Sequence, residues 1–177
     1  PRYAQAQTIS FTDERIKAVV LDLDGLQGGG LAKLQTIGDK IQKVRDAGKK
    51  VIAIGSGYTR DQYYLASRAD EVIMHELGLV YLEGYDYYRM FFRSALEKLQ
   101  VDLNVFRVGE FKSFVEPFIR DDMSAEDREA SQVWLSGLWS AWERDVAAAR
   151  KLKPGALQSY ADDLASRIEA EKGNAAR

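Results

Sequence analysis

The chain has 177 residues, of which 46% are hydrophobic and 29% charged, as expected for one globular domain with a real core. Its formal net charge of -2 gives no general attraction to nucleic acid, so we expect no nucleic-acid partner. The absence of cysteine excludes disulfides and thiol chemistry, and the single histidine, His75, excludes a histidine-rich metal site within one chain.

The two ends of the sequence, at Pro1 and Arg177, do not resemble natural domain boundaries. We therefore expect a fragment, or the ordered part, of a longer protein. No apolar run approaches the roughly 18 residues that cross a bilayer, so a membrane anchor would lie outside this chain.

Strands and helices alternate in the first half of the chain. Four short apolar runs predict strands, at residues 16–23, 51–54, 71–74 and 79–82. Apolar residues at helical spacing predict a helix from Leu31 through Val44, which Gly48 ends, and a second helix covers residues 61–67. This alternation predicts parallel βαβ units and an α/β layer architecture.

The second half predicts mostly helices. Residues 87–99 form an aromatic-rich amphipathic pattern, and residues 101–108 alternate like a strand. Residues 124–127 resemble a capping box with Asp in place of Glu, and they open a helix that runs to about Arg150. A last polar helix follows the Pro154–Gly155 pair.

The segment between the predicted strand and the long helix contains a candidate catalytic lysine. Lys112 stands between Phe111 and Phe114, which can remove it partly from water. Desolvation disfavours the ammonium and lowers a lysine pKa from about 10.4 toward the range of a general base. Judged from these residues alone, a surface lysine with an apolar stem is the stronger interpretation.

The same segment carries a family resemblance. The run from Phe106 to Ser124, FRVGEFKSFVEPFIRDDMS, resembles the lysine segment of the long protease IV type of signal peptide peptidase. The run DQYYLAS from Asp61 resembles the same family, and the likeness extends from about Asp13 to Ala149. Phe111 stands where the family leads us to expect tyrosine.

The resemblance implies a crotonase-like (ClpP-type) α/β fold repeated in tandem, with residues 1–177 as the single domain of the amino-terminal repeat. In that family the amino-terminal repeat supplies a lysine base, and the carboxy-terminal repeat supplies the serine nucleophile and a glycine-rich oxyanion hole. Lys112 matches the base, which takes the proton of the serine and returns it to the leaving amine.

The resemblance also implies a cellular setting. It predicts hydrolysis of signal peptides without a cofactor, at the bacterial inner membrane with the catalytic part facing the periplasm. It predicts a homo-oligomer, with a tetramer favoured, and a missing carboxy-terminal repeat as the catalytic partner. We expect this chain to be inactive alone.

The turn after the second predicted strand lacks a usable nucleophile. In the match, Asp61 stands at the nucleophile position, and Gln62 and Tyr63 replace glycines. A carboxylate cannot act as a nucleophile of this type, and bulky neighbours would obstruct an oxyanion hole. Ser56 and Thr59 carry hydroxyls but stand at the wrong place in the match.

A different enzyme class remains an alternative. The first strand with Asp22 and Asp24 resembles the first motif of magnesium-dependent phosphatases of the haloacid-dehalogenase type. Ser56, Lys112 and the pair Asp121–Asp122 follow in the order of the other motifs. Against this, the acidic pair does not follow a strand of its own. We therefore expect Asp22 and Asp24 to bind backbone amides or basic side chains nearby.

Three further features have simple interpretations. Gly28–Gly30 could cradle a phosphate but lacks the Lys-Ser/Thr of a P-loop, so a flexible turn is favoured. His75 is predicted in a loop without a catalytic partner. The aromatic side chains are either core or surface buried against sister subunits, the missing repeat or a membrane. They are Tyr85, Tyr87, Tyr88, Phe91, Phe92, Trp134, Trp139 and Trp142.

Besides a peptidase repeat and a phosphatase, a third possibility for the whole chain is a non-catalytic assembly module with a vestigial lysine.

Overall fold

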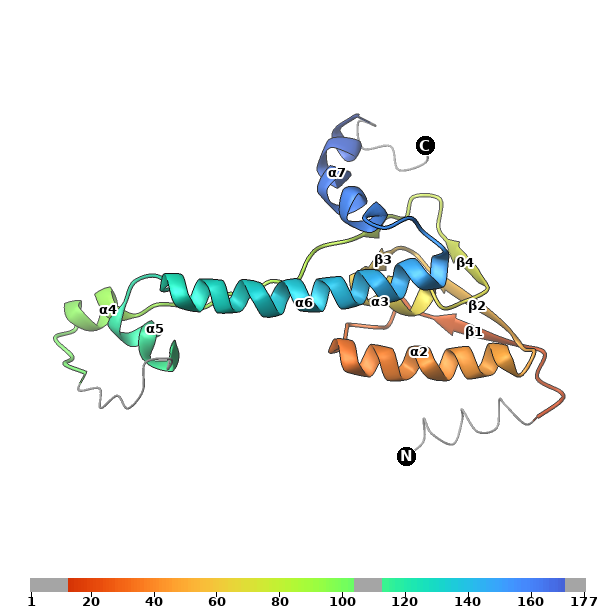
Figure 1. The fold of residues 1–177 in the computed structure, drawn as a ribbon, viewed down its shortest axis with the longest axis horizontal. Helices are drawn as coiled ribbons and strands as arrows, with labels where there is room; N and C mark the ends of the chain where they lie inside the picture. The colour runs from red at the N-terminus through yellow and green to blue at the C-terminus, as the bar shows by residue number, and fades with distance from the viewer. Residues whose placement is uncertain (1–12, 104–112, 171–177) are drawn as a thin grey trace. The chain divides into compact units, whose positions relative to one another are not determined.

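The computed structural model describes residues 13–103 and 113–170 (Figure 1). The chain divides into two compact units. The first unit combines Pro1–Gly84 with Ser140–Arg177, and the second unit is Tyr85–Trp139. Within the described ranges, no helix combines the length and the apolar character that crossing a membrane requires.

The first unit contains two parallel βαβ units. Its elements up to residue 84 are β1 (Ala18–Asp22), α2 (Leu31–Asp46), β2 (Lys50–Gly55), β3 (Tyr58–Thr59), α3 (Arg60–Ala66), β4 (Glu71–Met74) and β5 (Val80–Tyr81). The main sheet has the order β1-β2-β4, with every pair parallel. The helices α2 and α3 connect its strands, which confirms the predicted α/β class with parallel βαβ units. The strand predicted at residues 79–82 forms as β5, but it pairs with the two-residue β3.

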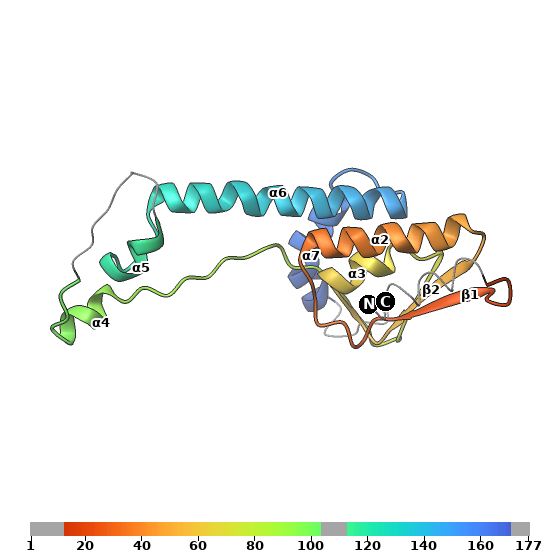
Figure 2. The same ribbon diagram turned by 90° about the horizontal axis from the view of Figure 1, so that it is seen from below.

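The two faces of the main sheet differ in burial. Val51 and Ala53 on β2 are 1% and 0% exposed. Helices α2 and α3 lie on one face of this sheet (Figure 2). On the opposite face, Val20 and Ile73 flank β2 and are 56% and 47% exposed. Parallel sheets are normally covered on both faces, so this apolar face is unusual in the described structure.

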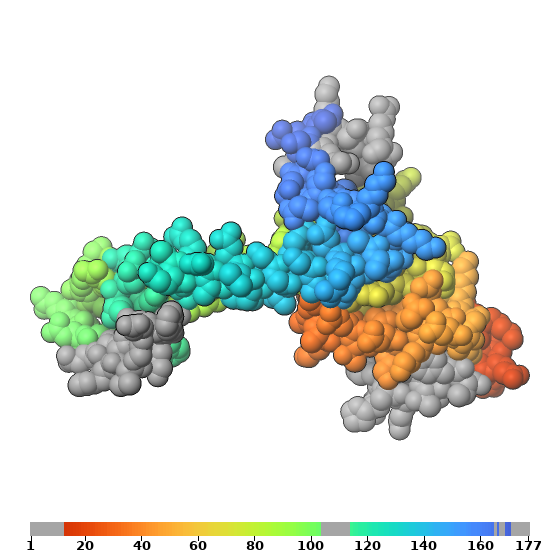
Figure 3. Space-filling model, viewed as in Figure 1, coloured from red at the N-terminus to blue at the C-terminus, as the bar shows by residue number. Residues whose placement is uncertain are grey.

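The end of α6 (Ala125–Arg150) packs on the helical layer of the first unit. Trp142 and Val146 are completely buried. The indole N–H of Trp142 donates to the carbonyl of Arg60 at 3.2 Å. Figure 3 shows the last turns of α6 against α2. The final helix α7 (Ala156–Ala170) is tied to β5 because Tyr160 donates its hydroxyl to the carbonyl of Val80 at 2.9 Å.

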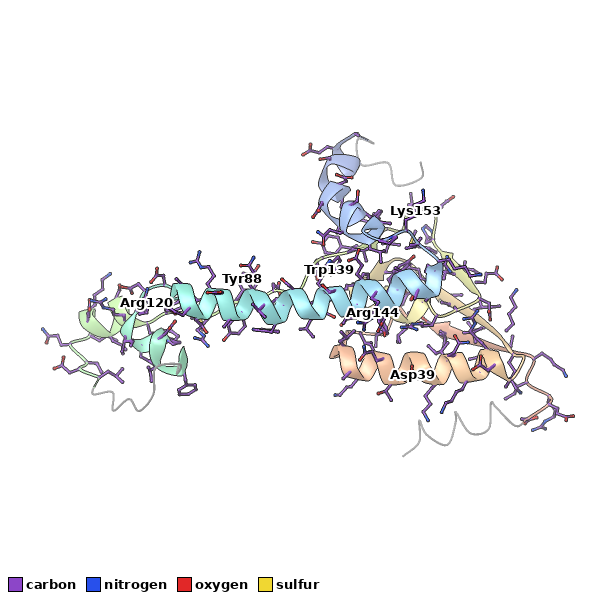
Figure 4. The ribbon with its side chains drawn as sticks, viewed as in Figure 1. Asp39, Tyr88, Arg120, Trp139, Arg144 and Lys153 are labelled. Atoms are coloured by element: carbon purple, nitrogen blue, oxygen red, sulfur yellow. The ribbon has the colours of Figure 1, made fainter. Side chains whose placement is uncertain are left out.

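The second unit is helical and carries exposed aromatic residues. Its elements are α4 (Arg93–Lys98), a short 3-10 turn at Ser113–Val115, α5 (Glu116–Ile119) and the first part of α6. Tyr88, labelled in Figure 4, is 88% exposed.

The prediction of one helix over residues 87–99 is wrong for its first six positions. Only Arg93–Lys98 is helical. In the preceding residues, Arg89 makes a local bond to the Tyr87 hydroxyl at 2.7 Å and a long-range bond to Asp127 at 3.1 Å, and both favour a non-helical conformation there. The strand predicted at residues 101–108 is absent at 101–103, and its remainder lies outside the described residues.

Candidate functional site

The candidate base Lys112 lies outside the described residues, so its position stays a prediction. The described chain resumes at Ser113, in the 3-10 turn that leads into α5. Phe114, which was expected to shield the lysine from water, is 82% exposed. Within this chain Phe114 therefore gives little support to the desolvation argument.

The segment that follows Lys112 is anchored by a buried carboxylate. Glu116 is 7% exposed and accepts the hydroxyl of Ser124 at 2.6 Å and its backbone N–H at 3.2 Å. The Ser124 hydroxyl oxygen also accepts the N–H of Asp127 at 3.1 Å, which confirms the predicted cap of α6. In a capping box the side chain at position 127 would accept the backbone N–H of Ser124. Here Glu116 accepts that N–H, and the Asp127 carboxylate pairs with Arg89 instead.

The hydrogen bonds decide the charge state of Glu116. Burial alone would raise the pKa of its carboxyl group. The hydroxyl and amide of Ser124 and the charges of Arg120 and Arg89 outweigh burial and hold the pKa below its ordinary value. Glu116 is thus an ionised, buried anchor directly after the lysine segment.

The acidic pair at the end of the segment has structural partners. Asp121 accepts the backbone N–H of Ser94 at 2.9 Å and its hydroxyl at 2.6 Å, in the first turn of α4. Asp122 pairs with Arg120 at 3.1 Å. These contacts fasten the lysine segment to α4 and give the pair a role other than metal binding.

Asp61 lies in the first turn of α3, where the sequence match places a nucleophile. It is 9% exposed, and its Oδ2 accepts the backbone N–H of Gly29 at 3.0 Å. Its Oδ1 accepts the Nε–H of Arg60 at 3.0 Å. The glycine run before α2 is therefore bound by an internal carboxylate, which corrects the expectation of a flexible turn.

Two neighbours complete this turn. The hydroxyl oxygen of Thr59 accepts the N–H of Gln62 at 3.5 Å, and the Gln62 side chain accepts the N–H of Thr59 at 2.8 Å. These two bonds form a capping box at the start of α3. Its Thr-x-x-Gln pattern is visible in the sequence, but the cap was not predicted from it. No comparable sequence pattern indicates that Asp61 binds Gly29 and Arg60.

The candidate phosphatase pair binds amides, as expected. Asp22 accepts the N–H of Asp24 at 3.2 Å. Asp24 accepts the N–H of Ser56 at 2.7 Å and its hydroxyl at 2.9 Å, and these bonds lower the pKa of the Asp24 carboxyl. Among the described residues, no three His, Asp or Glu side chains are grouped to hold a metal ion. The phosphatase alternative gains no support from this arrangement.

His75 follows β4 in a loop, as predicted. Its Nδ1 accepts the N–H of Leu77 at 3.1 Å. This is a local turn contact and requires no catalytic role.

Comparison with known families identifies the chain as a member of a peptidase family. The model of Peptidase family S49 matches residues 43–175, well over half of the sequence and including the lysine segment. The chain therefore belongs to peptidase family S49.

Individual relatives agree with this assignment. Protease 4 of Haemophilus influenzae is 41% identical over 162 residues, which cover 92% of this chain and 26% of the relative. Protease 4 of Salmonella typhi is 40% identical over 158 residues, or 87% of this chain and 26% of the relative. The chloroplastic serine protease SPPA of Arabidopsis thaliana is 26% identical over 157 residues, or 89% of this chain and 23% of the relative. The chain thus spans about a quarter of the length of these relatives.

Proposed function

We propose that this chain is the amino-terminal, lysine-bearing repeat of a serine peptidase with a Ser/Lys dyad. Lys112 is its general base, and the fold is a crotonase-like repeat formed by residues 1–177. The observation that carries the proposal is the family match across residues 43–175, which includes Lys112. A neutral amine in that position takes the serine proton and later delivers it to the leaving amine.

The nucleophile comes from a second, carboxy-terminal repeat. The hydroxyls near the matching turn have other partners: Ser56 donates to Asp24, and Thr59 caps α3. Asp61 is buried among its own donors. These contacts support the proposal that this repeat lacks a nucleophile and is inactive alone.

The substrates are signal peptides, and the protein acts without a cofactor at the bacterial inner membrane, with its catalytic part facing the periplasm. It assembles as a homo-oligomer, with a tetramer favoured. The exposure of Val20 and Ile73 on one face of the main sheet supports burial against further polypeptide. Exposed aromatic residues of the second unit, such as Tyr88, support the same conclusion.

The division of labour is tested by comparing this chain with the full-length protein. Each is incubated with a fluorogenic peptide and, separately, with a serine-directed fluorophosphonate probe. We expect turnover and labelling only in the full-length protein. Specific labelling of a serine within residues 1–177 would refute the proposed location of the nucleophile.

A further inference from the structure

The turn between β1 and α2 is bound to α3 through a buried anion. Asp61 is 9% exposed, and burying a carboxylate is costly unless directed donors replace its hydration. The amide of Gly29 reaches Oδ2 at 3.0 Å, and Nε of Arg60 reaches Oδ1 at 3.0 Å. Each oxygen of one planar group thus has its own donor.

The glycine run is shaped for this contact. Gly28 has a φ of +119°, which residues with a side chain rarely adopt. A Cβ at this position would lie 3.0 Å from Oδ2 of Asp61. The adjacent Gln62 donates from its side chain to the carbonyls of Leu23 and Leu26, both at 3.0 Å. The loop before α2 is therefore bound to α3 at two places, through the Gly29 amide and through the carbonyls of Leu23 and Leu26.

The charged donor is positioned by groups other than Asp61. Arg60 donates through Nη1 to the carbonyl of Gly84 at 2.8 Å. Its backbone carbonyl accepts the indole N–H of Trp142 at 3.2 Å. These bonds do not involve the Asp61 side chain, so the Arg60 guanidinium keeps a partner when that side chain is removed. The loop before α2 then remains bound through the Gln62 side chain.

We propose that the Gly29 amide and the Arg60 guanidinium form a carboxylate-binding site, and that Asp61 is its built-in occupant. The ligand class is a small carboxylate, because the two donors match two oxygens of one planar group. While Asp61 fills the site, it keeps external carboxylates, including the carboxyl terminus of a peptide, out of this turn. The proposal concerns binding and does not depend on the proposed peptidase function.

Chemical rescue tests the site. Asp61→Gly removes the carboxylate, and sodium formate is then titrated while the melting temperature and the amide signal of Gly29 are followed by NMR. We expect formate to raise the melting temperature of the variant saturably and to shift the Gly29 signal. Wild-type protein, which has a filled site, should show neither change. Asp39→Ala, on the exposed surface of α2 (Figure 4), is the matched control, and sodium chloride controls for ionic strength.

The proposal is overturned if formate does not raise the melting temperature of Asp61→Gly saturably. It is also overturned if formate raises the melting temperature of the wild type, or if sodium chloride has the same effect as formate on the variant. Asp61→Asn covers the case in which the glycine variant does not fold. It keeps the shape and loses the charge, so we expect a lower melting temperature and a displaced Gly29 signal. Wild-type stability with an unchanged Gly29 signal in Asp61→Asn would also overturn the proposal.

Discussion

The hydroxyl of Tyr64 on α3 donates to the carboxylate of Asp145 on α6 at 2.9 Å. Gln35 on α2 donates to the same oxygen at 3.0 Å, so one carboxylate joins three helices. Tyr64 is fully buried, and burial followed by the bond to Asp145 raises the pKa of its hydroxyl to about 12. Burial would raise the pKa of Asp145, but its donors, Gln35 and Tyr64 first, hold it below the ordinary value.

Tyr64→Phe should destabilise the chain because the partly buried carboxylate of Asp145 loses one of its donors. A buried group left short of a partner typically costs about 1–3 kcal/mol. Urea unfolding measures the free energy, with Tyr81→Phe, at a residue 48% exposed, as the control. Equal stabilities for the two variants would show that the Tyr64–Asp145 contact contributes nothing.

The stabilising effect of Glu116 should disappear in acid. Its folded pKa is depressed, so its contribution is present above the ordinary glutamate pKa of about 4.3 and is lost as the pH falls through the lower folded value. Wild type should therefore be more stable than Glu116→Gln at pH 6, and the difference should shrink toward pH 3. Urea unfolding at both pH values measures this. Glu97→Gln, on the surface of α4, should show little change, and a pH-independent difference for Glu116→Gln would contradict the assignment.

Gly28→Ala should destabilise the chain by about 1–3 kcal/mol, because alanine is strained at positive φ and its Cβ displaces Asp61. Gly25→Ala is the matched control, since a Cβ there meets nothing within 4 Å. We expect the control to be neutral or slightly stabilising. Similar unfolding free energies for the two variants would mean that the glycine run has no special conformational requirement.

Because Val20 lies on the exposed face of the main sheet, Val20→Thr should affect stability differently in this chain and in the full-length protein. Val20→Thr should change the stability of the 177-residue chain by no more than about 0.5 kcal/mol, because Val20 is 56% exposed. In the full-length protein, where we propose that this face is buried, the loss should be clearly larger. Val51→Thr, at a residue 1% exposed, should be destabilising in both. A harmless Val20→Thr in the full-length protein would argue against burial of this face.

The sequence predicted the βαβ core well, because β1, β2 and β4 are short apolar runs and α2 has apolar residues at helical spacing. β3 has only two residues and no such pattern. Residues 87–92 have helical periodicity, but the side-chain contacts of Arg89 with Tyr87 and Asp127 override it.

The candidate site was predictable only where it is local. Asp24 follows the end of its strand, so binding to nearby amides could be expected, and Ser124 was recognisable as a cap. The contact between Asp61 and Gly29 spans 32 positions along the chain, and that between Tyr64 and Asp145 spans 81. No local pattern reports such pairs, and without further sequences neither pair could be inferred before the fold.

We propose Lys112 as the general base of the assembled peptidase. The most direct test of this role is the rate of peptide hydrolysis by the full-length protein carrying Lys112→Ala or Lys112→Arg, with Lys153→Ala, at an exposed position in the turn before α7, as the control. We predict that Lys112→Ala loses at least about 10²–10⁴-fold in activity without a loss of assembly. Lys112→Arg should fail equally, because a guanidinium stays protonated, whereas Lys153→Ala should be unaffected. Near-normal hydrolysis by Lys112→Ala would show that Lys112 is not the general base and would leave only the family relationship.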